Sequence, residues 1–222
     1  MSLPDSGSAE AVGFVLAGGQ SSRMGADKAL TQLDGEPLVV RALEVLREAG
    51  LPAAIAGARS PLGGFAPVVE DAAFGRGPLG GVCAGLAATD AERVVFLSVD
   101  MPLLPASLVS YLVRHAQITG AAVTVPSVNG FAQTFPAVVD RAALPALEAS
   151  LKAGTGGCFS AFQAAAAEVG LPFSILPVES LAQPGHVNPP DGLPAALWFL
   201  NVNSPAELER AQALLAAFHR VS

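Results

Sequence analysis

Short apolar runs alternate with longer amphipathic segments along the first half of this chain. Runs with the length of strands lie at residues 12–16, 53–56, 67–70, 93–99 and 121–126. Apolar positions recur at helical spacing over residues 37–49, 79–88 and 106–117. This alternation predicts parallel crossover connections, and so a Rossmann-like three-layer α/β/α fold with a mostly parallel central sheet.

The second half of the chain continues this pattern less regularly. It predicts an extended stretch, two helices and a strand at residues 131–139, 141–151, 159–168 and 173–178. Residues 183–194 are rich in proline, so we expect a loop there. Residues 197–203 are predicted to form a short strand. Ser204 and Glu207 then form the capping box of a last helix, which we expect to run to about residue 218.

Length and composition favour one globular domain. The chain has 222 residues, of which 51% are hydrophobic and 14% charged, so it can bury a sizeable core. We expect residues 12–222 to form this domain and residues 1–11 to be a loose tail. No apolar run reaches the roughly 18 residues of a membrane span. The amino terminus also lacks a secretory signal, so we expect a cytoplasmic protein without a membrane partner.

Charge and cysteine content exclude several classes of site. The formal charge of −7 disfavours nucleic acid as a partner, because a polyphosphate chain needs a broad basic face. A single nucleotide is not disfavoured, since loop amides, one or two cations and Mg²⁺ can balance its charge locally. Cys83 and Cys158 are isolated in the sequence, which predicts two buried, reduced thiols rather than a disulfide or a zinc site.

A glycine-bearing polar loop follows the first apolar run. Residues 16–28 read L-A-G-G-Q-S-S-R-M-G-A-D-K, with Arg23 and Lys28 as cations. Glycines let backbone N–H groups approach an anion closely, and ligands of open α/β folds bind at the carboxyl edge of the sheet. Neither the dinucleotide-binding turn nor the P-loop pattern fits this spacing. The alternative is an ordinary turn, but Lys28 is one of only two lysines in the chain, and we favour a phosphate site.

Two further segments predict ligand contacts at the same edge. Asp100 follows the central run 93–99 and precedes Pro102. A single carboxylate there suits Mg²⁺ bound together with substrate phosphates, although a helix-capping or turn aspartate is the alternative. Residues 75–81 form a second glycine cluster that leads into a helix. This cluster is either an anion site at a helix amino terminus or an ordinary strand-to-helix turn.

Four segments, taken in order, resemble a known family. They are L-A-G-G-x-x-x-R-M-G-x-x-K at 16–28, G-P-L-G-G at 77–81, D-x-P at 100–102 and N-V-N-S-P at 201–205. Together they make the chain similar to nucleotidyltransferases, and most closely to the MobA-like molybdenum cofactor guanylyltransferases. This resemblance covers about residues 12–218. It implies transfer of GMP from GTP to the terminal phosphate of molybdopterin, with release of pyrophosphate and Mg²⁺ as cofactor.

The resemblance also assigns roles to individual residues. It implies that backbone groups of Leu16, Ala17, Gly18 and Gly19 hold the guanine and ribose. Lys28 would contact the phosphates of GTP, Asp71 would lie on the nucleotide side, and Asp100 would bind Mg²⁺. With Arg23, Lys28 and Asp100 form the predicted catalytic set, while Asn201 and Asn203 would face molybdopterin. The chain departs from the family pattern near Ala56 and at Gln133.

Other functions remain open on the sequence alone. The first is a sister transferase that uses CTP on molybdopterin or a nucleotide on a sugar phosphate. The second is a nucleotide-binding regulatory partner without activity. The pair Gly18 and Gly19 favours GTP over CTP, and the presence of both Lys28 and Asp100 favours an enzyme. We expect a monomer or weak homo-oligomer that meets a molybdoenzyme or another protein of cofactor biosynthesis.

Overall fold

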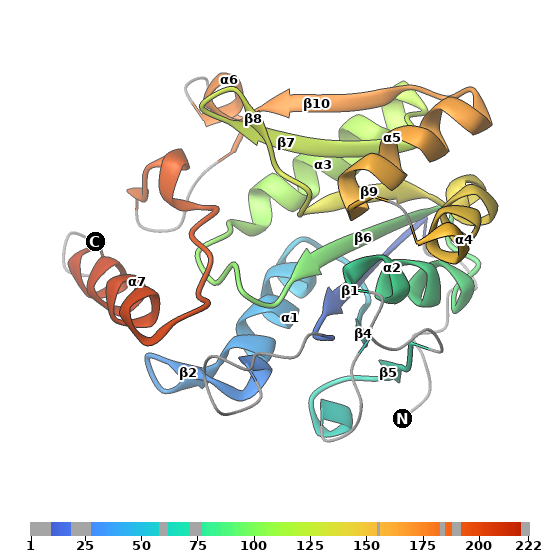
Figure 1. Ribbon diagram of the computed structural model, residues 1–222. Helices are drawn as coiled ribbons and strands as arrows, with labels where there is room; N and C mark the ends of the chain where they lie inside the picture. Colours follow the sequence, from blue (N-terminus) through green and yellow to red (C-terminus); the bar gives the residue numbers. More distant parts are fainter. Residues whose placement is uncertain are drawn as a thin grey trace.

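The computed structural model has one central sheet between two layers of helices (Figure 1). It describes residues 10–18, 28–57, 62–71, 77–154, 156–182, 185–187 and 192–218. The eight-stranded sheet has the order β10-β7-β9-β6-β1-β4-β5, with β8 paired to β7. Along this path only β9 runs against its neighbours. The predicted mostly parallel α/β/α fold is therefore confirmed.

The strands are short, as the apolar runs predicted. They are β1 (Ala11–Leu16), β4 (Ala53–Ala56), β5 (Val68–Val69), β6 (Arg93–Ser98), β7 (Val123–Val128), β8 (Phe131–Ala132), β9 (Ala137–Asp140) and β10 (Phe173–Pro177). A separate hairpin pairs β2 (Gln32–Leu33) with β3 (Glu36–Pro37). β1 begins at Ala11, within the range assigned to the loose tail, and residues 1–9 lie outside the described part.

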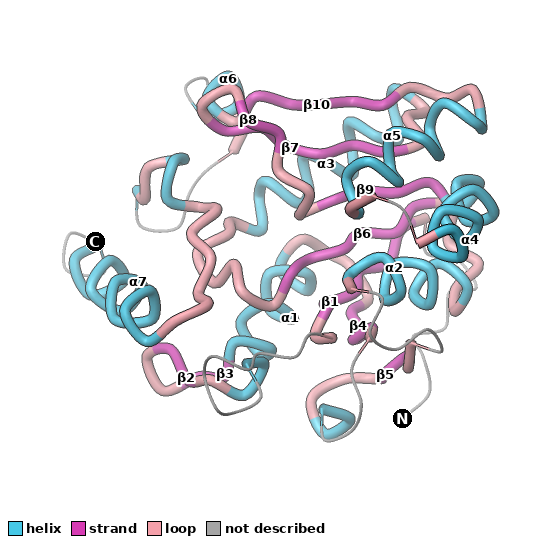
Figure 2. The backbone as a smooth tube through the Cα atoms, in the orientation of Figure 1, coloured by secondary structure: helices cyan, strands magenta, loops and turns pink. Residues whose placement is uncertain are grey.

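Helices cover both faces of the sheet (Figure 2). They are α1 (Leu38–Glu48), α2 (Pro78–Ala87), α3 (Ala106–Thr119), α4 (Leu144–Ala153), α5 (Cys158–Val169), α6 (Glu179–Ala182) and α7 (Pro205–Phe218). Buried residues of α1 and α3 belong to one apolar cluster, and those of α2, α4 and α5 to the other. None of the helices in the described ranges is long and apolar enough to cross a membrane.

Strands β1 and β6 form the buried centre of the sheet. Every residue of β1 is buried, and β6 pairs with it in parallel over six residues, from Ala11 with Arg93 to Leu16 with Ser98. β4 lies on the other side of β1, again in parallel. Strands covered by helices on both faces need apolar side chains in both directions, which accounts for the nearly continuous apolar runs.

One predicted strand is wrong. Residues 197–203 do not join the sheet: Leu197 ends the 3-10 helix Ala195–Leu197 (η5), and residues 198–203 follow as a turn and irregular backbone. Their apolar residues are buried for another reason, because Trp198 and Val202 pack fully buried into the cluster beside α3. The indole N–H of Trp198 donates to the Leu193 carbonyl at 2.8 Å. The expectation that Trp198 is a core residue is confirmed.

We expect Gly85→Ala to destabilise the protein, although alanine is the better helix former. A Cβ at Gly85 in α2 would lie 2.8 Å from Phe96 Cε1 and 3.3 Å from the Phe14 ring. Overpacking of this kind costs about 1–3 kcal/mol. Gly63→Ala is the matched control, because nothing lies within 4 Å of its Cβ position. Urea unfolding of both variants checks this, and equal midpoints would contradict the close packing.

The two cysteines are free thiols, Cys83 buried in α2 and Cys158 half-buried at the start of α5. Burial raises the pKa of Cys83 to about 11 and that of Cys158 to about 12. The thiolate is the reactive form, so we expect both to react slowly with iodoacetamide near neutral pH. Mass spectrometry of the folded and urea-unfolded protein checks this; rapid labelling of the folded chain would be the contrary result.

Candidate functional site

Four parallel strands end side by side at one edge of the sheet (Figure 1). Gly18, Gly57, Asp71 and Asp100 follow the ends of β1, β4, β5 and β6. The order β6-β1-β4-β5 puts Asp100 and Asp71 three strand spacings apart, or about 14 Å. This edge therefore brings residues of four distant segments into one row, where ligands of open α/β folds bind.

Lys28 and Asp100 form an ion pair at this edge. Lys28 begins the 3-10 helix Lys28–Leu30 (η1), and its Nζ lies 2.8 Å from Asp100 Oδ2. The lysine and aspartate side chains are 15% and 17% exposed, so both are largely shielded yet reachable from solvent. The structure thus brings together the predicted phosphate-binding lysine and the predicted metal-binding aspartate.

Asn203 completes a group of three around the lysine. Lys28 Nζ also donates to Asn203 Oδ1, across 175 residues of sequence. Asn201 does not take part, since its Nδ2 donates weakly to the Phe199 carbonyl at 3.4 Å. The two asparagines predicted to act together therefore have different surroundings in the described part of the chain.

The Asp100 carboxylate is fixed from two sides. Ser98, the last residue of β6, donates its hydroxyl to Asp100 Oδ1, while Lys28 takes Oδ2. The Asp100 carbonyl accepts the backbone N–H of Val202 at 2.9 Å. Sequence reasoning missed Ser98; its position two residues before the aspartate, with a hydroxyl in an otherwise apolar strand, is the signal that could have revealed it.

Asp71 lies at the amino terminus of α2. A Cβ at Gly80 in the first turn of that helix would lie 2.0 Å from Asp71 Oδ2, so the carboxylate sits directly against the glycine. Negative charge is favourable at a helix amino terminus, where backbone N–H groups carry partial positive charge. The sequence left the glycine cluster as either an anion site at a helix amino terminus or an ordinary strand-to-helix turn. In the structure, the anionic group beside this helix start is the protein's own Asp71 carboxylate.

Three glycines allow the backbone to close tightly beside this point. A Cβ at Gly18 would lie 2.3 Å from the Gly57 carbonyl oxygen, and Gly57 itself has φ +79°. The Cβ position of Gly57 is 3.5 Å from Gly81 Cα in α2. Only glycine fits at Gly18 without moving backbone, so the loop after β1 starts in direct contact with the end of β4.

The structure describes only some of the remaining predicted site residues. Leu16 is buried at the end of β1, and Ala17 donates its N–H to the Ala56 carbonyl at 3.1 Å. Gly19 and Arg23 lie outside the described residues. The roles that the sequence predicts for these residues stay predictions.

A single carboxylate is available for a metal at the centre of the edge. In the described ranges, no group of three or more His, Cys, Asp or Glu side chains could hold a metal ion. Mg²⁺ does not need such a group, because it binds through one or two carboxylates together with substrate phosphates and waters. Asp100, with its side chain partly exposed and Lys28 beside it, fits that requirement.

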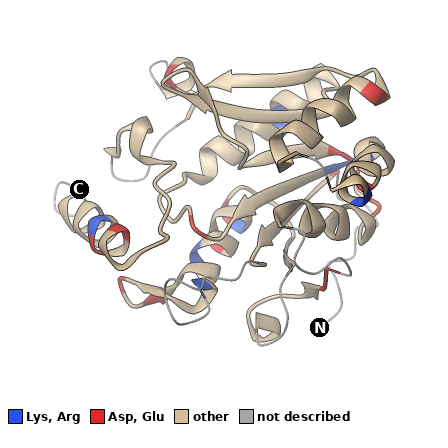
Figure 3. Cartoon of the chain, viewed as in Figure 1, with Lys and Arg blue, Asp and Glu red and all other residues tan. Residues whose placement is uncertain are grey.

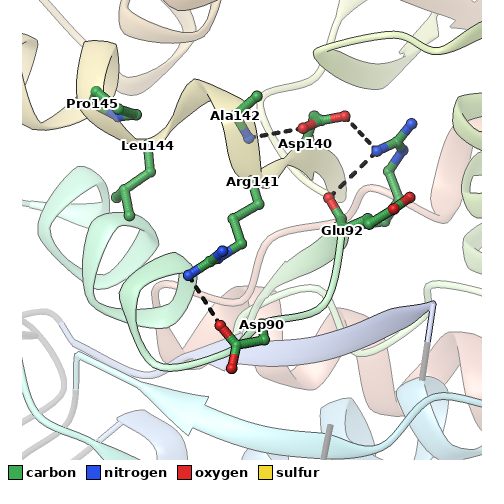
Figure 4. Close-up of a pocket in the computed structure, with 8 residues that line it drawn as sticks. Asp90, Glu92, Asp140, Arg141, Ala142, Leu144 and Pro145 are labelled. Carbon is green, nitrogen blue, oxygen red and sulfur yellow. Dashed lines mark hydrogen bonds and ion pairs between the residues drawn. The ribbon is translucent and has the colours of Figure 1, made fainter. Parts of the chain in front are cut away.

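A surface pocket of about 590 Å³ lies elsewhere, at the opposite end of β6 (Figure 4). Arg93, at the start of β6, pairs with Asp140 of β9, and Arg141 pairs with Asp90 at 3.1 Å. The first pair joins β6 to β9 in register with their strand pairing, and the second joins the segment before β6 to the 3-10 turn after β9. Charged residues that line this pocket are thus paired with one another, and we assign them a structural role.

Comparisons with known proteins agree with this geometry. The family model of the MobA-like NTP transferase domain matches residues 13–169. A probable molybdenum cofactor guanylyltransferase of Opitutus terrae is 39% identical over 64% of this chain and 72% of its own length. The corresponding protein of Thermococcus gammatolerans is 31% identical over 89% of this chain and 96% of its length.

Another relative is more similar over a shorter range. The molybdenum cofactor guanylyltransferase of Xanthomonas euvesicatoria is 45% identical over 47% of this chain, and the match spans 54% of that relative. Among solved structures, molybdopterin-guanine dinucleotide biosynthesis protein A of Archaeoglobus fulgidus superposes with a TM-score of 0.73. That match covers 92% of this chain and 98% of the other at 21% identity, so it supports the fold.

The matched range runs from β1 to the end of α5, and so contains Lys28, Asp71 and Asp100. Because this range is more than half of the chain, the sequence match, the sheet order and the arrangement of the edge lead to one conclusion: the chain belongs to the family of MobA-like NTP transferases.

Proposed function

We propose that this protein is a Mg²⁺-dependent guanylyltransferase that moves GMP from GTP to the terminal phosphate of molybdopterin and releases pyrophosphate. The observation that carries the proposal is the contact of Lys28 with both Asp100 and Asn203 at the carboxyl edge of the sheet. The names of the relatives at 31–39% identity support the choice of GTP and molybdopterin.

The binding site follows from the row of strand ends. The backbone at Leu16, Ala17 and Gly18 lies between the ends of β4 and β6, where it would hold the nucleoside. Asp71, three strands from Asp100, would bound the nucleotide on the far side. The phosphates would then extend toward Lys28. Gly19 and Arg23 belong to the same loop by sequence, and we assign them to the nucleoside and the phosphates.

The reaction needs positioning and charge stabilisation more than proton transfer. An oxygen of the molybdopterin phosphate attacks the α-phosphorus of GTP, and the bond to the bridging oxygen of pyrophosphate breaks. A phosphate monoester is already an adequate nucleophile near neutral pH, so no side-chain base is required. The Lys28 ammonium, held at Asp100, stabilises the negative charge that grows on the phosphates and on the leaving group.

Asp100 would hold Mg²⁺ against the triphosphate. Bound Mg²⁺ supplies positive charge that polarises the phosphoryl oxygens and neutralises the leaving pyrophosphate. Ser98 keeps one carboxylate oxygen in place, and Lys28 is positioned on the other. Lys28 would keep its contact with Asp100 in the complex and direct a remaining N–H toward a phosphate oxygen. Asn203 stays on the lysine, at the side where we place the acceptor.

A cytidylyltransferase is the second candidate. The 2-C-methyl-D-erythritol 4-phosphate cytidylyltransferase of Thermus thermophilus shares the fold with a TM-score of 0.61 and 18% identity. The fold alone therefore does not distinguish a GTP-dependent from a CTP-dependent enzyme. Gly18 favours GTP in our interpretation, because we expect alanine at this position in a cytidylyl enzyme.

We expect Lys28→Ala to lower kcat/KM for pyrophosphate release by about 10²–10³, since it removes the cation beside the phosphates. The assay uses GTP, CTP, ATP and UTP in turn, each with Mg²⁺ and molybdopterin. Lys152→Ala, at the other lysine of the chain and exposed in α4, is the matched control. Preference of the wild type for CTP would transfer the proposal to the cytidylyl reaction.

Asp100→Asn separates an enzyme from a nucleotide-binding partner. The amide has nearly the same shape but lacks the charge that would bind Mg²⁺, so we expect kcat to fall by about 10²–10³. A protein that only binds nucleotide needs no such charge. Calorimetric GTP titrations with and without Mg²⁺ accompany the turnover assay. Unchanged Mg²⁺ dependence in the variant would exclude Asp100 as the metal ligand.

A further inference from the structure

Helix α7 is joined to the lysine site through its capping residues. Glu207, in the first turn, accepts the backbone N–H of Asn203 at 2.7 Å and the hydroxyl of Ser204 at 3.0 Å. In the usual capping box, the acid takes the N–H of the capping residue itself. Here the Glu207 carboxylate also takes the N–H one residue further back, that of Asn203, whose side chain contacts Lys28.

The surrounding contacts make this segment a bridge between α7 and β6. Val202 donates its N–H to the carbonyl of Asp100, and the next residue, Asn203, donates its N–H to Glu207. Of these two adjacent residues, Val202 is therefore bonded to Asp100 and Asn203 to the first turn of α7. The side chain of Asn203 then meets the lysine.

The charge of Glu207 agrees with this arrangement. The Asn203 N–H, followed by the Ser204 hydroxyl, holds the pKa of Glu207 below its ordinary value, and the nearby charge of Lys28 acts in the same direction. The carboxylate is therefore ionised around neutral pH. An ionised acceptor makes a stronger bond to a backbone N–H than a neutral one does.

We propose that Glu207 is a positioning residue for nucleotidyl transfer: it fixes the backbone at Asn203 so that the asparagine oxygen holds the Lys28 ammonium beside Asp100. This proposal rests on the function proposed above. A lysine ammonium has three N–H groups on a flexible stem. With Asp100 and Asn203 accepting two of them, the direction of the third is fixed, and in the proposed complex it would meet a phosphate oxygen.

The competing explanation is that Glu207 only caps α7. Two variants separate the roles. Ser204→Ala removes the hydroxyl that accepts the Glu207 N–H at 3.4 Å, but it leaves the bond between Glu207 and the Asn203 N–H. Glu207→Ala removes the carboxylate that accepts the Asn203 N–H and the Ser204 hydroxyl, but it keeps the backbone N–H of residue 207 that donates to Ser204 Oγ. A purely capping role predicts that the two variants lose thermal stability and turnover in parallel.

The positioning role predicts a different set of rates. We expect Glu207→Ala to lower kcat by about tenfold to a hundredfold, with a smaller change in the KM for GTP. Ser204→Ala should keep most of the turnover. Glu207→Gln, whose amide oxygen still accepts an N–H, should recover most of the loss, and Glu209→Gln, exposed on the same helix, is the control.

A double mutant tests whether Glu207 acts through Asn203. If it does, Glu207→Ala should add little to the effect of Asn203→Ala on kcat, because the oxygen that it positions is already gone. Independent effects of the two substitutions, which multiply in the double variant, would overturn the proposal. Equal losses in Ser204→Ala and Glu207→Ala would overturn it as well.

The last measurement does not depend on activity. The chain has two lysines, so a spectrum of ¹⁵N-labelled lysine side chains should contain the Lys28 and Lys152 ammonium groups alone. We expect the Lys28 signal, assigned with Lys28→Ala, to be protected from exchange in the wild type and in Ser204→Ala. It should weaken in Glu207→Ala and in Asn203→Ala.

The two proposals can therefore fail separately. In one outcome, the Lys28 signal loses its protection in Glu207→Ala, but the wild-type protein releases no pyrophosphate from any nucleotide. That outcome would support the positioning contact and reject the proposed function. Active wild-type protein whose Lys28 signal is unchanged in Glu207→Ala would reject the positioning role and leave the proposed function in place.

Discussion

The contact of Lys28 with Asp100 depends on the parallel order of the sheet. Asp100 follows β6 and Lys28 lies beyond the loop that follows β1, and these strands are parallel neighbours over six residues. If β1 ran in the opposite direction, its loop would leave from the other edge. The right order and direction of two buried strands therefore bring a cation and a carboxylate 72 positions apart to within 2.8 Å.

Close backbone approach is the second constraint on this edge. Gly18 lies against the Gly57 carbonyl, and Gly80 lies against the Asp71 carboxylate. At both points a Cβ would occupy space already filled by another segment. The glycines of the proposed nucleotide site thus first let the protein's own strand ends and helix start approach one another. A larger residue would disturb the site before any ligand bound.

The basic residues of the described chain are spread over several elements and act on nearby groups. The chain carries a formal charge of −7, and Figure 3 shows Lys and Arg on several separate elements of the described chain. At the candidate site, the Lys28 ammonium lies between Asp100 and Asn203, and its charge also lowers the pKa of Glu207. Such an arrangement suits a small anionic ligand that accepts the remaining N–H of the lysine.

The sequence alone determined most of the strand and helix order and the mostly parallel sheet, because apolar periodicity is a local signal, and it singled out Lys28 and Asp100, which the structure brings together. It also predicted the cap formed by Ser204 and Glu207. Only the tertiary structure decided that residues 197–203 cover the sheet edge instead of extending the sheet. It alone placed Ser98 on Asp100 and joined Asn203 to Lys28. These contacts link segments far apart in the chain, and their geometry follows from packing that no local pattern records.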